Sequence, residues 1–165
     1  MATRNDTDAG RPRLLERLMT LELDADETCR VAAEHLADPR YQEQLQAFRA
    51  DYQRHLRELT PITRQLGGQP PGRPDLRGRL EEGRVLFAQL GGDDGILKAI
   101  RANAEKLLEA YEQALGQEPA AQEAIARGCA DQRRHLDWLN ATIRTIETAP
   151  HRGVPPWNIP PPSGF

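Results

Sequence analysis

Three residues that can bind a metal or carry a proton fall where a helical core calls for aliphatic side chains. Glu22, His55 and His135 each interrupt an apolar stripe with helical spacing. At 1.5 Å per residue, Glu22 lies roughly 22 Å from the expected end of its segment, and His55 lies roughly 24 Å from the start of the next. His135 lies at a matching depth in a later segment. A carboxylate and two imidazoles in a dry core must hydrogen-bond one another or bind a metal ion.

The stripes define the helices that must position these residues. The stripe around Glu22 consists of Leu15, Leu18, Ala25, Cys29, Ala32 and Leu36. The stripe around His55 consists of Tyr41, Leu45, Phe48, Tyr52, Leu59, Ile62 and Leu66. The stripe around His135 consists of Ile125, Gly128, Gln132, Leu139, Thr142 and Ile146. Tyr52, and Tyr111 on a further stripe, are expected to be core residues with hydrogen-bonded hydroxyls.

Composition indicates one all-α domain. The chain has 165 residues, only 5% of them aromatic, and Ala, Leu, Glu, Gln and Arg dominate while β-branched residues are scarce. A net charge of −3 creates no field that attracts nucleic acid or an anionic membrane. No apolar stretch suits a membrane span or a signal peptide, so we expect no nucleic-acid or membrane partner and a cytoplasmic protein. The two cysteines are expected to be small buried hydrophobes.

Turn and cap signals divide the chain. Residues 1–11 are polar and aperiodic and are expected to be a disordered arm, followed by a helical domain over 12–148 and an extended, Pro-rich tail over 149–165. The first helix is expected over 12–37, and Asp38 and Pro39 begin a second that ends before Gly67 and Gly68. A Pro- and Gly-rich stretch leads to a short helix over 76–90. Asp94 is expected to cap a third long helix, and Pro119 opens the fourth.

A short repeat relates the two halves of the domain. The pattern Ala-Asp-x-x-Arg-His-Leu occurs at 50–56 and again at 130–136, each time in the second long helix of a pair. Because both copies fall in the middle of a core stripe, we interpret the domain as two antiparallel hairpins derived by duplication. The crossover between them contains the short extra helix.

Several stretches, in this order, resemble the ferritin-like and rubrerythrin-related four-helix bundles, and within them a bacterial family of uncharacterised ferritin-like domains. The matching stretches are LELDADETCRVA, FRADYQRHLREL followed by LGGQPP, AEKLLEAYEQAL and DQRRHLDWL. The resemblance covers about residues 14–146. It implies a ferritin-like four-helix bundle, and it implies iron handling or stress response as the setting.

The resemblance also implies a ligand set, from which this chain departs. Ferritin-like di-iron sites use one Glu from each of the first and third helices and Glu-x-x-His from the second and fourth. Glu22, His55 and His135 match three of these ligands. Tyr52 and Gln132 stand where the other two helices should supply Glu, and the third helix has Ala104 on its seam. The chain therefore lacks the carboxylates that a complete ferroxidase centre needs.

Two interpretations of the core residues stay open. Glu22, His55 and His135 can form a mononuclear site for one Fe, Mn or Zn ion, with Asp51 and Asp131 as partners of the ligands and Glu27 and Glu105 in reserve. Arg54 and Arg134 compete for the two aspartates. Alternatively, the layer is a relict in which Glu22 accepts hydrogen bonds from both histidines and no metal binds. Haem is not expected, because the sequence lacks CxxCH and the seams are crowded.

Three functions follow from these interpretations. The first is a ferritin-like bundle protein with a degenerate metal site or a relict polar layer. The second is a mononuclear iron oxidoreductase that uses Glu22, His55 and His135. The third is a non-catalytic helical scaffold whose tail, residues 151–165, docks on a protein partner or on a second copy in a homo-oligomer.

Overall fold

The computed structural model describes residues 6–72 and 77–149, with side chains from residue 13 and from residue 83 onward in these two stretches. The described residues are all-α. Five α-helices and one short 3-10 helix follow one another: α1 (Asp6–Ala33), α2 (Pro39–Gln65), α3 (Arg77–Gln89), α4 (Asp93–Ala114), η1 (Pro119–Ala121) and α5 (Gln122–Thr148). The predicted tail, residues 149–165, lies almost wholly outside the described residues.

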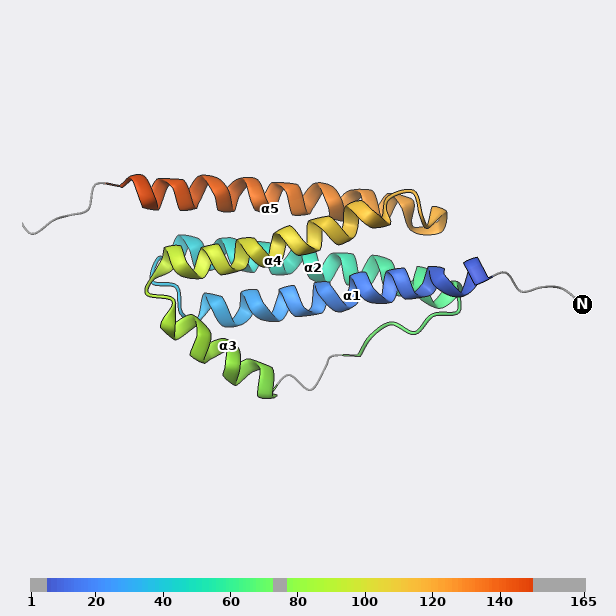
Figure 1. Ribbon diagram of the computed structural model, residues 1–165, viewed down its shortest axis with the longest axis horizontal. Coiled ribbons are helices and arrows are strands. Elements are labelled where there is room, and N and C mark those ends of the chain that lie inside the picture. The colour runs from blue at the N-terminus through green and yellow to red at the C-terminus, as the bar shows by residue number, and fades with distance from the viewer. Residues whose placement is uncertain (1–5, 73–76, 150–165) are drawn as a thin grey trace, which may run out of the picture.

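The four long helices lie side by side along the long axis of the molecule (Figure 1). α1 packs against α2 and α4 packs against α5, and the two pairs meet through contacts of α1 with α4 and of α2 with α5. α1 and α5 run in one direction, and α2 and α4 run in the other (Figure 1). The chain therefore crosses the length of the molecule between α2 and α4, and α3 packs on α1 along this crossover.

The expected seams form the core. Every member of the stripe around Glu22 is buried, and so are Leu97, Ile100, Ala104, Leu107, Tyr111 and Ala114 on α4. On α5 the seam shifts by one position beyond His135, because Ile143 is buried there while Thr142 is only partly covered. Both cysteines are buried and free, as expected.

The turn between α1 and α2 differs from the expected one. α1 ends at Ala33, before the predicted end at residue 37, and the Asp93 carboxylate accepts hydrogen bonds from the backbone N–H groups of Ala37 and Asp38. This distant carboxylate stabilises the chain in a non-helical path at that point. Asp38 caps α2 as predicted, by accepting a bond from the backbone N–H of Arg40.

Two other predicted boundaries need correction. α1 begins at Asp6, so residues 6–11 belong to the helix and not to the arm. The cap of α4 is Gly92, which offers no side chain, and Asp94 lies in the first turn, where its carboxylate bonds Lys98. An acidic first turn still complements the positive end of the helix dipole.

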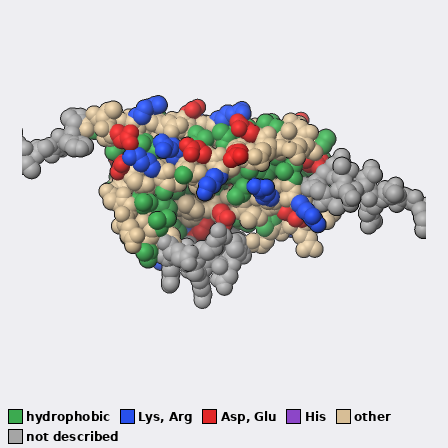
Figure 2. All heavy atoms as spheres, in the orientation of Figure 1, with side chains coloured by type: hydrophobic (Ala, Val, Ile, Leu, Met, Phe, Trp, Pro, Cys, Tyr) green, Lys and Arg blue, Asp and Glu red, His purple; other side chains and the backbone are tan. Residues whose placement is uncertain are grey.

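Acidic and basic side chains are interspersed over the face of the molecule seen in Figure 2. Among the described residues, no helix combines the length and the apolar character that a membrane span requires. Large apolar side chains that stand exposed are Val85 and Leu86, both on α3.

α4 and α5 pack closely at Gly128. A Cβ atom at this position would lie 2.3 Å from the ring of Tyr111. We expect Gly128→Ala to lower the free energy of unfolding by about 1 to 3 kcal/mol, because the ring has to shift in a packed core. Urea denaturation followed by circular dichroism measures the change.

Gly83 provides the matched control for this substitution. It also lies within a helix, but a Cβ atom there would be 3.9 Å from the nearest side chain, that of Val31. Gly83→Ala should stabilise the protein by about 0.5 to 1 kcal/mol through helix propensity alone. An equal effect of the two substitutions would contradict the packing described here.

Candidate functional site

The two copies of the repeated motif meet where α2 and α5 pack against each other. His55 of α2 bonds Asp131 of α5, with Nε2 to Oδ2 at 3.0 Å. In return, His135 of α5 bonds Asp51 of α2, with Nε2 to Oδ2 at 2.9 Å. Each histidine thus finds the aspartate of the other copy. This reciprocal pattern is what two equal segments produce when they meet across a local two-fold axis.

The two arginines of the motif connect both aspartates. Arg54 donates to Asp51 Oδ1 at 2.8 Å and also to Asp131. Arg134 donates to Asp51 Oδ2 at 2.7 Å and also to Asp131. The guanidinium groups reach the surface, since the Arg134 side chain is 61% exposed. The charges of the two guanidinium groups thereby balance those of the two carboxylates where the hairpins meet.

Glu22 extends this cluster into the core. Its side chain is fully buried, and its Oε1 atom accepts hydrogen bonds from His55 Nδ1 at 3.0 Å and from the Tyr111 hydroxyl at 2.6 Å. A continuous hydrogen-bonded row therefore runs from Tyr111 of α4 through Glu22 of α1 and His55 of α2 to Asp131 of α5. It contains one residue from each long helix.

The two histidines differ in charge because only one of them faces Glu22. Burial lowers the pKa of His55, but the hydrogen bonds and charges of Glu22 and Asp131 outweigh it, and the net shift is upward. Burial also raises the pKa of Glu22, while the hydrogen bond from His55 opposes that shift. With a carboxylate facing each ring nitrogen, the raised pKa favours the form of His55 that carries both protons.

His135 is held in its neutral form. Burial lowers its pKa to about 4, Arg134 adds to that shift, and the hydrogen bond to Asp51 only partly opposes it. Its ring stacks on Phe48 with centroids 3.9 Å apart, and it meets the edge of Tyr52. Because Nε2 bonds a carboxylate, the single proton belongs on Nε2, and Nδ1 has no hydrogen-bond partner.

Both aspartates remain ionised. Burial raises the pKa of Asp51 and of Asp131, but hydrogen bonds from the opposite histidines lead the interactions that lower it, and the net shift is downward for both. The side chain of Asp51 is 14% exposed and that of Asp131 is 11% exposed. The acidic half of the cluster is thus charged at neutral pH.

The structure brings together part of the expected site. Glu22 and His55 are bonded, but Glu22 does not accept from both histidines as the relict interpretation predicted: its second bond comes from Tyr111. His135 is buried and bonds Asp51. The aspartates were expected to be partners of the metal ligands or to be bound by arginine. In the structure each bonds the histidine of the opposite copy and both arginines.

The reserve ligands lie elsewhere. Glu27 bonds Arg30 on the same helix, and Glu105 is an exposed residue that faces Arg101. Within the part of the chain that the structure describes, no group of three or more His, Cys, Asp and Glu side chains is arranged to hold a metal ion. The metal site stays a prediction.

Sequence reasoning did not identify two features of this region. It expected a bonded hydroxyl on Tyr111 without naming Glu22 as the acceptor. It also missed Asp26, which is buried between α1 and α2 and bonds Arg49 Nε at 2.8 Å. Asp26 directly follows the seam residue Ala25, and a charged residue beside a seam is the only signal that the sequence offers.

Comparison with known proteins identifies the family but no function. Residues 13–117 match a domain of unknown function, DUF2383. Since this stretch is more than half of the chain, the protein belongs to that family. The matched residues end before η1, so Asp131 and His135 of α5 lie beyond them. No curated protein and no solved structure was found to match the chain.

The opposite pKa shifts of the two histidines predict opposite effects of pH on stability. The folded-state pKa of His135 is about 4, below the unfolded value, so its contribution is present above about pH 6.5 and is lost as the pH falls towards 4. His135→Gln keeps a donor for Asp51 and removes the titration. When the pH falls from 7 to 4.5, the free energy of unfolding should decrease by about 2 to 3 kcal/mol less in this variant than in the unmodified protein.

His55→Gln serves as the counterpart. The folded-state pKa of His55 is raised, so its contribution is complete below the unfolded pKa and is lost as the pH rises through the folded value. This variant should therefore be destabilised most at acid pH. Guanidinium denaturation at several pH values measures both profiles, and parallel profiles for the two variants would refute the assigned charge states.

Proposed function

We propose that the protein is a ferritin-like four-helix bundle. Support comes from the two antiparallel pairs, α1 with α2 and α4 with α5, and from the parallel course of α2 and α4, which requires one long crossover (Figure 1). Ferritin-like folds have one such crossover. The repeated motif and the resemblance of the sequence stretches favour the same assignment.

The polar layer of this bundle acts, on our proposal, as a relict joint between the hairpins rather than as a two-iron centre. The observation that carries the proposal is the reciprocal pairing of His55 with Asp131 and of His135 with Asp51. Both Nε2 atoms are thereby occupied by carboxylates. Arg54 and Arg134 supply the positive charge that metal ions provide in a ferroxidase centre. A two-iron centre does not fit this donor set.

In this proposal the protein is a non-catalytic member of the ferritin-like class, with bacterial stress or iron handling as the setting that the resemblance implies. The hydrogen-bonded row from Tyr111 to Asp131 ties all four long helices together. A buried charged network of this kind fixes how helices pair more than it adds stability. The bundle thus presents a rigid body with a defined surface to its partners.

One observation favours the alternative, a mononuclear metal site and with it an iron oxidoreductase. Glu22 Oε2, His135 Nδ1 and both polar atoms of the Gln132 side chain are buried without a hydrogen-bond partner. Unpaired buried polar atoms are costly, and a bound ion or water removes that cost. Glu22 Oε2 and His135 Nδ1 are two possible ligand atoms, but among the described residues no third carboxylate or imidazole is arranged to complete a site with them. The residues therefore do not fit a three-ligand site without rearrangement.

Elemental analysis separates these functions. Protein purified from cells supplied with iron, manganese and zinc should contain less than about 0.2 equivalents of any transition metal per chain. About one equivalent in the unmodified protein, lost in His135→Ala and retained in the exposed-site variant Glu105→Ala, would establish the metal site and overturn the relict proposal.

Removing either aspartate should destabilise the bundle whether or not metal is present. Asp51→Asn and Asp131→Asn each leave guanidinium and imidazole groups without their charged acceptor, and we expect losses of about 2 to 4 kcal/mol in the free energy of unfolding. Urea denaturation with and without a chelator measures the loss.

Glu112→Gln is the matched control, because Glu112 forms an exposed ion pair with Arg133 at 2.8 Å. Its loss should stay below about 0.5 kcal/mol. If the chelator abolishes the difference between the Asp51→Asn protein and the unmodified protein, the aspartates act through a metal and the joint is not the explanation.

A further inference from the structure

An aromatic groove lies where the start of α2 meets the last turns of α5. It has a volume of about 510 Å³. Its lining residues are Arg40, Tyr41, Gln44, Trp138, Ala141, Thr142 and Thr145. The rings of Tyr41 and Trp138 meet edge to face, with centroids 6.0 Å apart, and Trp138 also packs edge-on against the buried Phe48. The aromatic wall of the groove is therefore fixed by the core.

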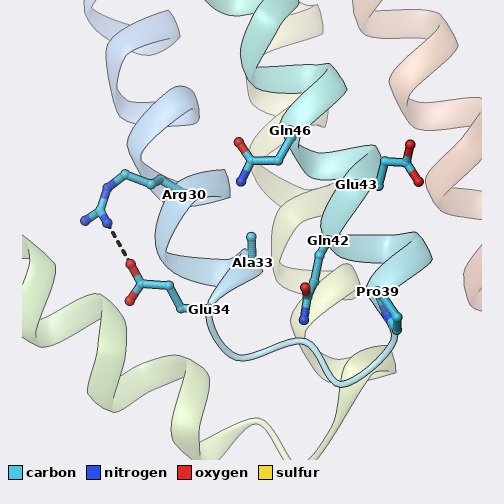
Figure 3. Close-up of a pocket in the computed structure, with 7 residues that line it drawn as sticks. All are labelled: Arg30, Ala33, Glu34, Pro39, Gln42, Glu43 and Gln46. Carbon is cyan, nitrogen blue, oxygen red and sulfur yellow. Dashed lines mark hydrogen bonds and ion pairs between the residues drawn. The ribbon is translucent and has the colours of Figure 1, made fainter.

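The groove between the end of α1 and the start of α2 has a different character. Its volume is about 440 Å³, and its lining consists mainly of amide and charged side chains, among them Gln42, Glu43 and Gln46 (Figure 3). Arg30 and Glu34 at its edge already bond each other at 2.7 Å. It offers no aromatic ring, so an apolar ligand is better matched by the groove at Trp138.

The chemistry of the aromatic groove suits a proline-rich segment. Extended proline-rich chains dock in grooves lined by Trp and Tyr, because proline rings stack on aromatic faces and the segment loses little conformational entropy. Polar groups beside the rings, here Gln44 and Thr142, supply hydrogen bonds for the exposed backbone carbonyls of such a segment. The one charged side chain of the lining is Arg40, and it forms an ion pair with Asp38 at 2.6 Å.

The chain itself contains a segment of this composition directly after α5. Residues 150–165 lie outside the described residues, and they include six of the 13 prolines and one of the two tryptophans. α5 ends at Thr148, one helical turn beyond the groove residue Thr145. The ligand segment is thus tethered next to the groove, which gives it a high effective concentration there.

The length of the segment suffices for a return to the groove. From Thr148 back to Trp138 the helix measures roughly 15 Å at 1.5 Å per residue. From Ala149 to Trp157 an extended chain reaches roughly 25 Å at 3.1 Å per residue. The difference leaves room for a reversal, and Gly153 is a residue that accommodates one.

We propose that residues 150–165 dock in the groove of their own chain, with Pro155, Pro156 and Trp157 against Tyr41 and Trp138. The docked segment would cover the exposed side of the α2–α5 contact near its end. This inference is independent of the proposed polar layer, since it uses none of the residues of that layer.

Fluorescence of Trp138 tests the proposal in the full-length chain. Trp157→Phe keeps an aromatic ring in the segment and leaves Trp138 as the only tryptophan, which is excited selectively over the three tyrosines. A second variant with Pro155→Ser, Pro156→Ser and Trp157→Ser has the same single tryptophan and lacks the docking groups. We expect acrylamide to quench Trp138 about twofold more strongly in the serine variant, because a docked segment shields the indole.

Blocking the groove should remove the effect of the segment. Ala141 is exposed, so Ala141→Arg in the Trp157→Phe background fills the groove without disturbing the core, and the serine substitutions should then no longer change the quenching of Trp138. Gln46→Arg places the same side chain in the other groove and should leave the quenching unchanged.

Two results would overturn the proposal. Equal quenching of Trp138 in the phenylalanine and serine variants would show that the segment does not cover the groove. A difference that disappears on dilution, together with a dimeric mass by light scattering, would show that the occupant is the segment of a second copy and not that of the same chain.

Discussion

The structure depends on the fact that two buried imidazoles need hydrogen-bond partners that their own helices do not supply. α2 and α5 each carry an aspartate one turn before the histidine, and the antiparallel meeting of the two helices places each aspartate against the opposite histidine. A shift of one helix along the other by a single turn would break both bonds and leave charges without partners in a largely dry interface. The register of the two hairpins is thereby fixed at their centre.

This arrangement starts from equal segments but does not stay symmetric. α1 contributes Glu22 to the ring of His55, whereas α4 has Ala104 on its seam, and His135 Nδ1 is left without a partner. One histidine therefore carries two protons between two carboxylates, and the other is neutral and stacked on Phe48. The same motif yields two different charge states because Glu22 is present on one side only. Tyr111 completes the asymmetry, because Glu22 accepts its second hydrogen bond from the Tyr111 hydroxyl and not from His135.

Much of the architecture follows from the sequence, because helical spacing of apolar residues, Pro at helix starts and Gly at helix ends act locally. The helices and the buried seams were predicted in this way, and Glu22, His55 and His135 were correctly expected inside the core. The partners of those residues were harder to predict. Whether Asp131 bonds the histidine of its own helix or that of α2 depends on the angle and register at which the helices meet, which the sequence does not state. The end of α1 at Ala33 depends similarly on Asp93, a residue 60 positions further along the chain. Asp93 comes close to the end of α1 only when the chain has folded.

The most direct test of this account is the protonation state of the two core imidazoles, measured by long-range ¹H–¹⁵N NMR at pH 7 with the signals assigned through single His→Gln variants. Of the four histidines in the chain, His55 should show two protonated ring nitrogens, and His135 should show one protonated nitrogen, Nε2, and one bare nitrogen, Nδ1. Two identical, neutral rings that titrate together near pH 6.5 would contradict the crossed pairing and the role of Glu22.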